Sequence, residues 1–217
     1  MKTIRLSRRL IWLGLSIFIL SACSNIEGSR NVNNASVSGR TLAVQVCSAC
    51  HGVTGDATSP NFPKLAGQQK GYLIAQLEDF KGHARSNAKG QEHMWGFTRL
   101  TKGQIAELAD YFSAQEPMRG RNRQLGPLAR GETIYRNGLP DLGVAQCSAC
   151  HGASGEGNAS FPRLAGQHAN YLIQQIEIFQ ATEQRPRGGV MKQVTHGLTR
   201  TDSEAVAQYL ESIGVIK

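Results

Sequence analysis

The chain has 217 residues, with 24 lysines and arginines against 16 acidic residues and a net charge of +8. This length accommodates one large domain or two small ones. Aromatic residues make up only 6% of the chain and are not interleaved with any arginine-rich motif, so the basic charge does not indicate a nucleic-acid partner.

The first 22 residues have the pattern of a bacterial signal peptide. A positive segment precedes an apolar stretch at 10–20, which is too short to cross a membrane comfortably. The following Leu20-Ser21-Ala22-Cys23 has the form of a lipobox, so we expect cleavage after residue 22 and a lipid on Cys23. The alternatives are an ordinary signal peptide with a spare cysteine, or an uncleaved anchor. Cleavage would lower the net charge from +8 to +4, because residues 1–22 hold four basic and no acidic residues.

Residues 23–38 are rich in serine and asparagine and have almost no large apolar side chains. This composition predicts a flexible tether. Ser38 is placed to cap a helix that runs from Gly39 to Cys47.

The hexapeptide Cys-Ser-Ala-Cys-His-Gly occurs twice, at 47–52 and 147–152. C-x-x-C-H is the attachment signature of c-type haem, in which both thiols bond the porphyrin and the histidine ligates the iron. We therefore predict two haem c groups. Their covalent ligands would be Cys47, Cys50, Cys147 and Cys150, and their proximal iron ligands His51 and His151. A zinc site assembled across both halves is an alternative, whereas a redox C-x-x-C lacks the expected βαβ pattern.

Each motif is followed by Phe-Pro-x-Leu-Ala-Gly-Gln, at 62–68 and 161–167, and then by an amphipathic helix. The matching helix positions are Tyr72, Leu73, Gln76, Leu77 and Phe80 in the first half, and Tyr171, Leu172, Gln175, Ile176 and Phe179 in the second. The carbonyls of Pro63 and Pro162 could accept the second ring N–H of the proximal histidines and so tune the iron. A helix-entry turn without an electronic role explains the motif equally well.

Each half has one methionine in a polar loop before its last helix: Met94, 43 residues after its histidine, and Met191, 40 residues after. A thioether is a soft iron ligand, so we predict that both are distal ligands, with core packing as the alternative. His93 could compete with Met94. The other histidines (His83, His168 and His196) are expected at the surface or beside the haem. A methionine in the sixth position leaves no open site for a substrate and favours electron transfer over catalysis.

The closing helix of the first half has a capping box at Thr101, and that of the second half at Thr199 or Thr201. A basic, Gly- and Pro-containing stretch at 116–127 is interpreted as a linker and divides the chain into domains at 39–115 and 128–217. Met118 lies in this linker and has no counterpart. The second domain has a longer approach to its motif, and no segment has the period of a strand, so we expect an all-α protein.

Basic residues surround the two methionine loops: Arg85, Lys89, Arg185, Arg187 and Lys192. Such a group could steer an acidic redox partner toward the haem edges. The alternative is a solvated rim without a partner.

These motifs together resemble the dihaem cytochromes c4 over residues 39–215, most specifically through Pro-Asn-Phe-Pro-Lys-Leu-Ala-Gly-Gln at 60–68. The resemblance implies two tandem cytochrome c domains related by a pseudo-twofold axis, His/Met ligation of both haems, and haem propionate edges that face one another. The apparent lipobox, the basic linker and the His93 and Trp95 that flank Met94 depart from the family pattern.

The resemblance also implies a periplasmic electron carrier that is not an enzyme and has no small-molecule substrate. Its expected partners are a membrane oxidase and donors of the quinol–cytochrome c reductase type, and the lipid would hold it at a membrane. The alternatives are an electron-transfer subunit of a larger dehydrogenase, a dihaem peroxidase and, last, a haem-based sensor.

Overall fold

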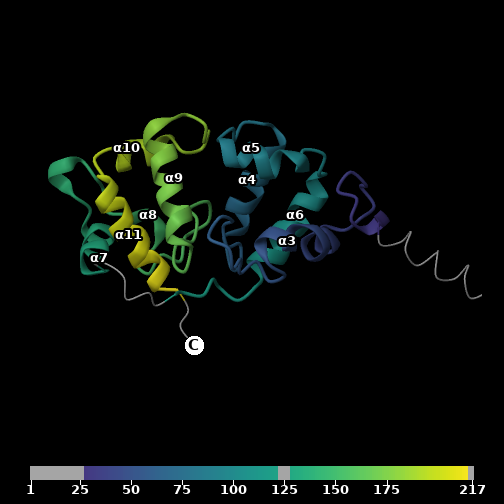
Figure 1. Cartoon of the computed structure of the whole chain (residues 1–217), viewed down its shortest axis with the longest axis horizontal. Helices are drawn as coiled ribbons and strands as arrows, with labels where there is room; N and C mark the ends of the chain where they lie inside the picture. The colour runs from purple at the N-terminus through teal and green to yellow at the C-terminus, as the bar shows by residue number, and fades with distance from the viewer. Residues whose placement is uncertain (1–26, 122–127, 215–217) are drawn as a thin grey trace, which may run out of the picture.

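The computed structural model describes residues 27–121 and 128–214, which form two helical lobes side by side (Figure 1). The first lobe contains α2 (Gly39–Leu42), a π-helical segment (Ala43–Cys47), α3 (Ser48–His51), α4 (Lys70–Lys81), α5 (Ala88–Met94), a 3₁₀ turn (Trp95–Phe97) and α6 (Lys102–Ser113). The second contains α7 (Leu128–Asn137), a 3₁₀ turn (Pro140–Leu142), α8 (Ser148–His151), α9 (Ala169–Ala181), α10 (Gly189–Thr195) and α11 (Arg200–Ser212).

The predicted all-α class is confirmed. The described ranges contain two isolated β-bridges and no strand. Nor does either range hold a helix with the length and apolar character needed to span a bilayer. The predicted signal peptide and Cys23 lie outside the described residues.

The first and last helices of each lobe cross at a glycine. A Cβ on Gly39 of α2 would lie 2.6 Å from the carbonyl oxygen of Gln104 in α6. A Cβ on Gly131 of α7 would overlap the carbonyl oxygen of Ala205 in α11. Only glycine allows the two backbones to approach so closely, and this crossing closes each lobe around its haem motif.

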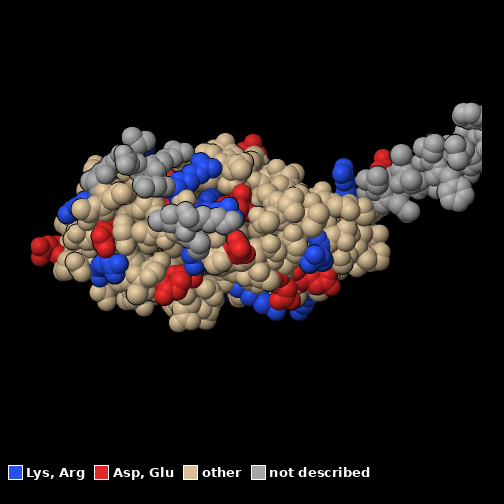
Figure 2. All heavy atoms as spheres, turned by 90° about the horizontal axis from the view of Figure 1, so that it is seen from below, with Lys and Arg blue, Asp and Glu red and all other residues tan. Residues whose placement is uncertain are grey.

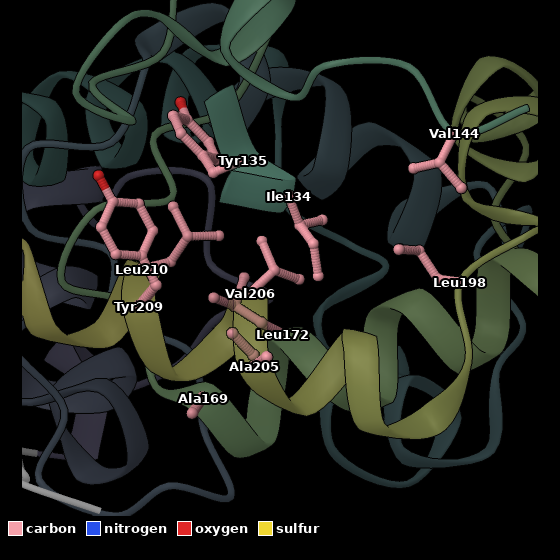
Figure 3. Close-up of a cluster of buried hydrophobic side chains, with 11 residues drawn as sticks. Ile134, Tyr135, Val144, Ala169, Leu172, Leu198, Ala205, Val206, Tyr209 and Leu210 are labelled. Carbon is pink, nitrogen blue, oxygen red and sulfur yellow. The ribbon is translucent and has the colours of Figure 1, made fainter. Parts of the chain in front are cut away.

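Each lobe has its own apolar core. In the second lobe, Ile134 and Tyr135 of α7 meet Val206 and Leu210 of α11, with Leu172 contributed by α9 (Figure 3). The equivalent core of the first lobe is built from Leu42, Leu73, Leu100, Ile105, Leu108 and Phe112. Both predicted capping boxes form, and in the second lobe the cap is Thr199 paired with Asp202 rather than Thr201.

The segment that precedes α2 is held against the first lobe, although it was predicted as part of a flexible tether. The side-chain amide of Gln104 donates hydrogen bonds to the carbonyls of Asn34 (3.0 Å) and Val37 (2.8 Å). Val32 and Val37 pack against the apolar core. Two apolar side chains and the amide of Gln104 together hold this segment on the lobe.

The predicted linker also makes specific contacts with both lobes. Met118 is fully buried, and its backbone N–H donates to the carbonyl of Ala66 in the first lobe at 3.2 Å. The backbone N–H of Arg121 donates to the carbonyl of Glu211 in the second lobe at 3.0 Å. Residues 118–121 therefore tie the two lobes together.

Candidate haem site

The two proximal histidines are held in the same way. His51 and His151 end the short helices α3 and α8, and the glycine after each has a positive φ (78° at Gly52 and 85° at Gly152) that turns the chain away. Nδ1 of His51 lies 2.9 Å from the carbonyl oxygen of Pro63, and Nδ1 of His151 lies 2.9 Å from that of Pro162. The predicted proline contact is thus confirmed in both lobes. Since a carbonyl can only accept, Nδ1 carries the proton and Nε2 keeps a lone pair for a metal.

Burial favours the neutral form of both rings. His51 is 7% exposed and His151 is 5% exposed. Burial lowers the pKa of each imidazole, while the hydrogen bond to the proline carbonyl acts in the opposite direction. A neutral imidazole is the form that coordinates iron.

One cavity of about 1050 Å³ extends through both lobes and joins the two candidate sites. The predicted ligands of both lobes line it: Cys47, Cys50, His51 and Met94, and Cys147, Cys150, His151 and Met191. Two thiols, a neutral imidazole, a thioether and an otherwise largely apolar wall form the donor set and surroundings that haem c requires. The residues present therefore fit two haem groups. When bound, each group supplies an iron that takes up and releases one electron.

The zinc alternative requires ligands from both halves. Within residues 27–121 and 128–214, no three His, Cys, Asp or Glu side chains come together in a way that could hold a metal ion. The structure thus does not assemble the four-ligand set that this alternative needs.

The other histidines differ in their surroundings. His93 lines the cavity together with Met94 and packs edge-to-face on Phe62, with 5.3 Å between the ring centroids. His83 stacks on Trp95, and His196 is exposed. The prediction for His168 is wrong. His168 is fully buried at the contact between the lobes, where Nε2 lies 2.8 Å from the carbonyl oxygen of Ala57, and it does not line the cavity.

The interpretation of the basic residues also needs correction, because Arg85 and Arg185 are only 6% and 7% exposed. Each guanidinium crosses between the lobes. Arg85 donates to Gln76 (2.8 Å), to Gln175 (3.1 Å) and to the hydroxyl of Tyr171 (3.3 Å). Arg185 donates to Gln76 (3.0 Å), to the hydroxyl of Tyr72 (3.3 Å) and to Gln175.

This buried cluster belongs to the cavity wall and not to a docking rim. Although burial acts the other way, the two guanidinium charges hold the pKa of the Tyr171 hydroxyl below its usual value. Two exposed cations of the expected set form ion pairs: Arg187 with Asp79 of the first lobe at 3.1 Å, and Lys192 with Glu183 of its own lobe. Figure 2 shows basic and acidic side chains interspersed over one face, with no single-sign patch that would define a partner surface.

The structure reveals four site residues to which the sequence reasoning gave no role. Tyr72 and Gln76 of α4, and Tyr171 and Gln175 of α9, were predicted only as positions on an amphipathic face. The two tyrosines are 99 positions apart in the sequence, and so are the two glutamines, as are Gln68 and Gln167. Identical polar residues at one constant offset are a signal that could have identified an interface between the repeats.

Together, the paired proximal histidines, the cysteine pairs and the methionines that line the cavity define a tandem c-type cytochrome. The family model described as cytochrome c matches residues 36–115 and 128–214. The chain is similar to cytochrome c4 of Azotobacter vinelandii, with 36% identity over 179 residues that cover 77% of this chain and 84% of the relative. It also resembles the solved cytochrome c4 structure from Acidithiobacillus ferrooxidans, with 38% identity, a TM-score of 0.72, and coverage of 76% of this chain and 97% of that one.

The chain belongs to the dihaem cytochrome c4 family, whose domains have the cytochrome c fold. It carries two covalently bound haem c groups and acts in electron transfer. The resemblance stated from the motifs and the expected pair of tandem cytochrome c domains are thereby confirmed. A further relative is the thiosulfate dehydrogenase electron acceptor of Stutzerimonas stutzeri, with 30% identity over 81% of this chain and 82% of that protein.

Proposed function

We propose that His51 and Met94 are the axial ligands of the first haem iron, and His151 and Met191 those of the second. The thioether bonds would come from Cys47 and Cys50, and from Cys147 and Cys150. This assignment is supported by the shared cavity, which all eight side chains line, and by the free Nε2 atom on both histidines.

In this proposal an electron enters at one haem, moves to the other and leaves to a protein partner. The observation that carries it is the continuity of the cavity between the lobes, because both sets of proposed ligands line this one cavity. Iron that is ligated on both sides makes and breaks no bonds in a substrate. We place the protein in the periplasm, held to a membrane by a lipid on Cys23, between donors of the quinol–cytochrome c reductase type and a membrane oxidase.

A second candidate function is that of an electron-transfer subunit of one larger dehydrogenase. The relative named thiosulfate dehydrogenase electron acceptor favours it, since it aligns along most of both chains. Purification of the native protein from membranes would separate the two roles. Recovery with a stoichiometric dehydrogenase favours the second candidate, and recovery alone or with an oxidase favours the first.

The ligand assignment is tested by optical redox titration of the wild type and of Met94→Ala and Met191→Ala. Each variant should lose about half of the weak far-red sulfur-to-iron band and convert one haem to a form that binds CO, because one sixth ligand is removed. Met118→Leu is the matched control, since Met118 is buried away from the cavity and its substitution should leave the band unchanged. A full band in both axial variants would overturn the assignment.

The lipid anchor is tested with Cys23→Ala. The wild type should incorporate labelled fatty acid and sediment with membranes. The variant should do neither while it retains both haems. A wild type that is unlabelled and found entirely in the soluble periplasmic fraction would contradict the anchor and leave the haem assignment untouched.

A further inference from the structure

The two Phe-Pro-x-Leu-Ala-Gly-Gln loops exchange their glutamine side chains across the contact between the lobes. Oε1 of Gln167 accepts from the backbone N–H of Lys64 at 2.9 Å, and its Nε2 donates to the carbonyl of Lys64 at 2.9 Å. Gln68 makes the same two hydrogen bonds to Arg163: its Oε1 accepts from the backbone N–H at 2.6 Å, and its Nε2 donates to the carbonyl at 2.9 Å. Gln68 and Gln167 are 4% and 3% exposed, so water does not compete for these bonds.

The acceptor atom of each glutamine is fixed by a second backbone group. Oε1 of Gln68 also accepts from the N–H of Gln69 at 2.9 Å, and Oε1 of Gln167 from the N–H of His168 at 3.0 Å. Two donors on one buried oxygen hold the side chain in a single orientation. The amide is therefore preorganised to face the opposite loop.

The group that each glutamine contacts is the one that holds a proximal histidine. The N–H of Lys64 and the carbonyl of Pro63 belong to one peptide unit, and that carbonyl accepts from Nδ1 of His51. The peptide unit between Pro162 and Arg163 likewise joins His151 to Gln68. A continuous line of hydrogen bonds thus runs from the histidine of one lobe, through one peptide unit, to the glutamine of the other.

Hydrogen bonds in such a chain polarise one another. An acceptor on the N–H of a peptide draws electron density toward its carbonyl oxygen, which then accepts more strongly from the histidine. A stronger hydrogen bond at Nδ1 makes the imidazole a more basic ligand. A more basic ligand stabilises the ferric state and lowers the reduction potential.

We infer that Gln68 and Gln167 are positioning residues that tune the haems crosswise: Gln167 lowers the potential of the first haem, and Gln68 lowers that of the second. The inference rests on the proposed proximal roles of His51 and His151. Each lobe thereby adjusts the redox centre of its neighbour, without contact with the cofactor, for as long as the lobes remain together.

The experiment measures both midpoint potentials of the full-length dihaem protein in Gln167→Leu and Gln68→Leu. Leucine has a similar size but neither accepts nor donates. The midpoint potential of the haem in the opposite lobe should rise by about 30–60 mV, which is a roughly three- to tenfold change in the one-electron equilibrium constant. The potential of the other haem should change less. Nitrogen-15-edited NMR of the reduced protein shows which histidine hydrogen bond has weakened. In Gln167→Leu the Nδ1–H signal of His51 should move upfield, while that of His151 stays in place.

Two further variants separate tuning from a merely structural role. Gln167→Glu keeps an oxygen acceptor for the Lys64 N–H, so the potential of the first haem should not rise. Gln69→Leu is the matched control. Its side chain also crosses between the lobes, to the carbonyl of Glu156 at 3.0 Å, but it does not touch the peptide unit beside His151. Both potentials should stay unchanged in this variant.

Equal shifts at both haems, a shift confined to the haem of the substituted lobe, or no shift would overturn the crosswise inference. These outcomes are distinct from failure of the proposed function, which would appear as an intact sulfur-to-iron band in the methionine variants. If Gln167→Leu does not fold, Gln68→Leu tests the same crosswise prediction independently at the second haem.

Discussion

Arg85 and Arg185 are individual residues with consequences for both redox centres, because their buried guanidinium groups line the shared cavity. Their hydrogen-bond partners are neutral amides and phenol hydroxyls, and the guanidinium groups lie over the aromatic rings of Phe80 and Phe179. Asp79 acts on Arg185 only through its charge, without a direct hydrogen bond. A buried cation that no carboxylate contacts directly is costly unless an anion joins it. Haem propionates are anions of the kind that would satisfy this cluster.

We predict that Arg85→Gln and Arg185→Gln lower the reduction potentials, since a positive charge near the iron disfavours the ferric state. A full charge at roughly 10 Å is worth about 1–2 kcal/mol at an effective dielectric constant of about 20, so shifts of tens of millivolts are expected in a redox titration. Arg200→Gln is the control, because this side chain is 73% exposed, is paired with Glu177 at 2.8 Å and does not line the cavity. A shift as large in the control as in the buried variants would argue against a local effect.

The prediction that Arg85 and Arg185 belong to an exposed basic rim was wrong for a simple physical reason. Charged residues are rarely buried unless they are paired, and one repeat considered alone offers each arginine only neutral amides, Gln76 and Asn87 for Arg85 and Gln175 for Arg185. Their other acceptors come from the opposite lobe, 86–113 positions away in sequence. The proline contacts of His51 and His151, by contrast, were predictable because they join residues only 11–12 positions apart.

At the scale of elements, the glycine crossings determine how tightly each lobe closes. We predict that Gly131→Ala destabilises the second lobe by about 1–3 kcal/mol, because the new methyl group would force α7 away from α11. Thermal unfolding followed at the Soret band should show an earlier transition that involves half of the haem absorbance.

Gly103→Ala supplies the matched control on an exposed turn of α6, where a Cβ would meet nothing closer than 3.8 Å. Alanine should there stabilise the helix by about 0.5–1 kcal/mol. An unchanged or higher melting temperature for Gly131→Ala would show that the crossing can relax.

Most elements were predictable because their signals are local. The capping box at Thr101, the helices after each Leu-Ala-Gly-Gln and the absence of strand periodicity all depend on a few neighbouring residues. The choice between Thr199 and Thr201 was not predictable, since both have an acid three residues later. The crossing with α7 decided it, because Arg130 pairs with Asp202 at 2.8 Å.

At the scale of the whole molecule, Met118 is the side chain that the linker contributes to the joint between the lobes. It is fully buried, and its sulfur lies 3.7 Å from Nε2 of Gln167. We predict that Met118→Ala costs about 2–5 kcal/mol, as other buried methionine truncations do, and that the two lobes then melt separately in calorimetry.

Val53→Ala is a suitable comparison because this side chain is 56% exposed. Its effect should stay within about 0.5 kcal/mol. If Met118→Ala melts like the wild type in a single transition, the linker contributes no coupling between the lobes.

The exchange of glutamines also bears on how such a chain could have arisen. Four of the contacts between the lobes form two reciprocal pairs: Gln68 with Arg163 and Gln167 with Lys64, then Arg85 with Tyr171 and Arg185 with Tyr72. Such reciprocity is the rule in a symmetric homodimer. A one-haem ancestor with the same loop could have paired with a second copy through the same bonds. Fusion then kept the pair together at a high effective concentration and allowed each half to change alone.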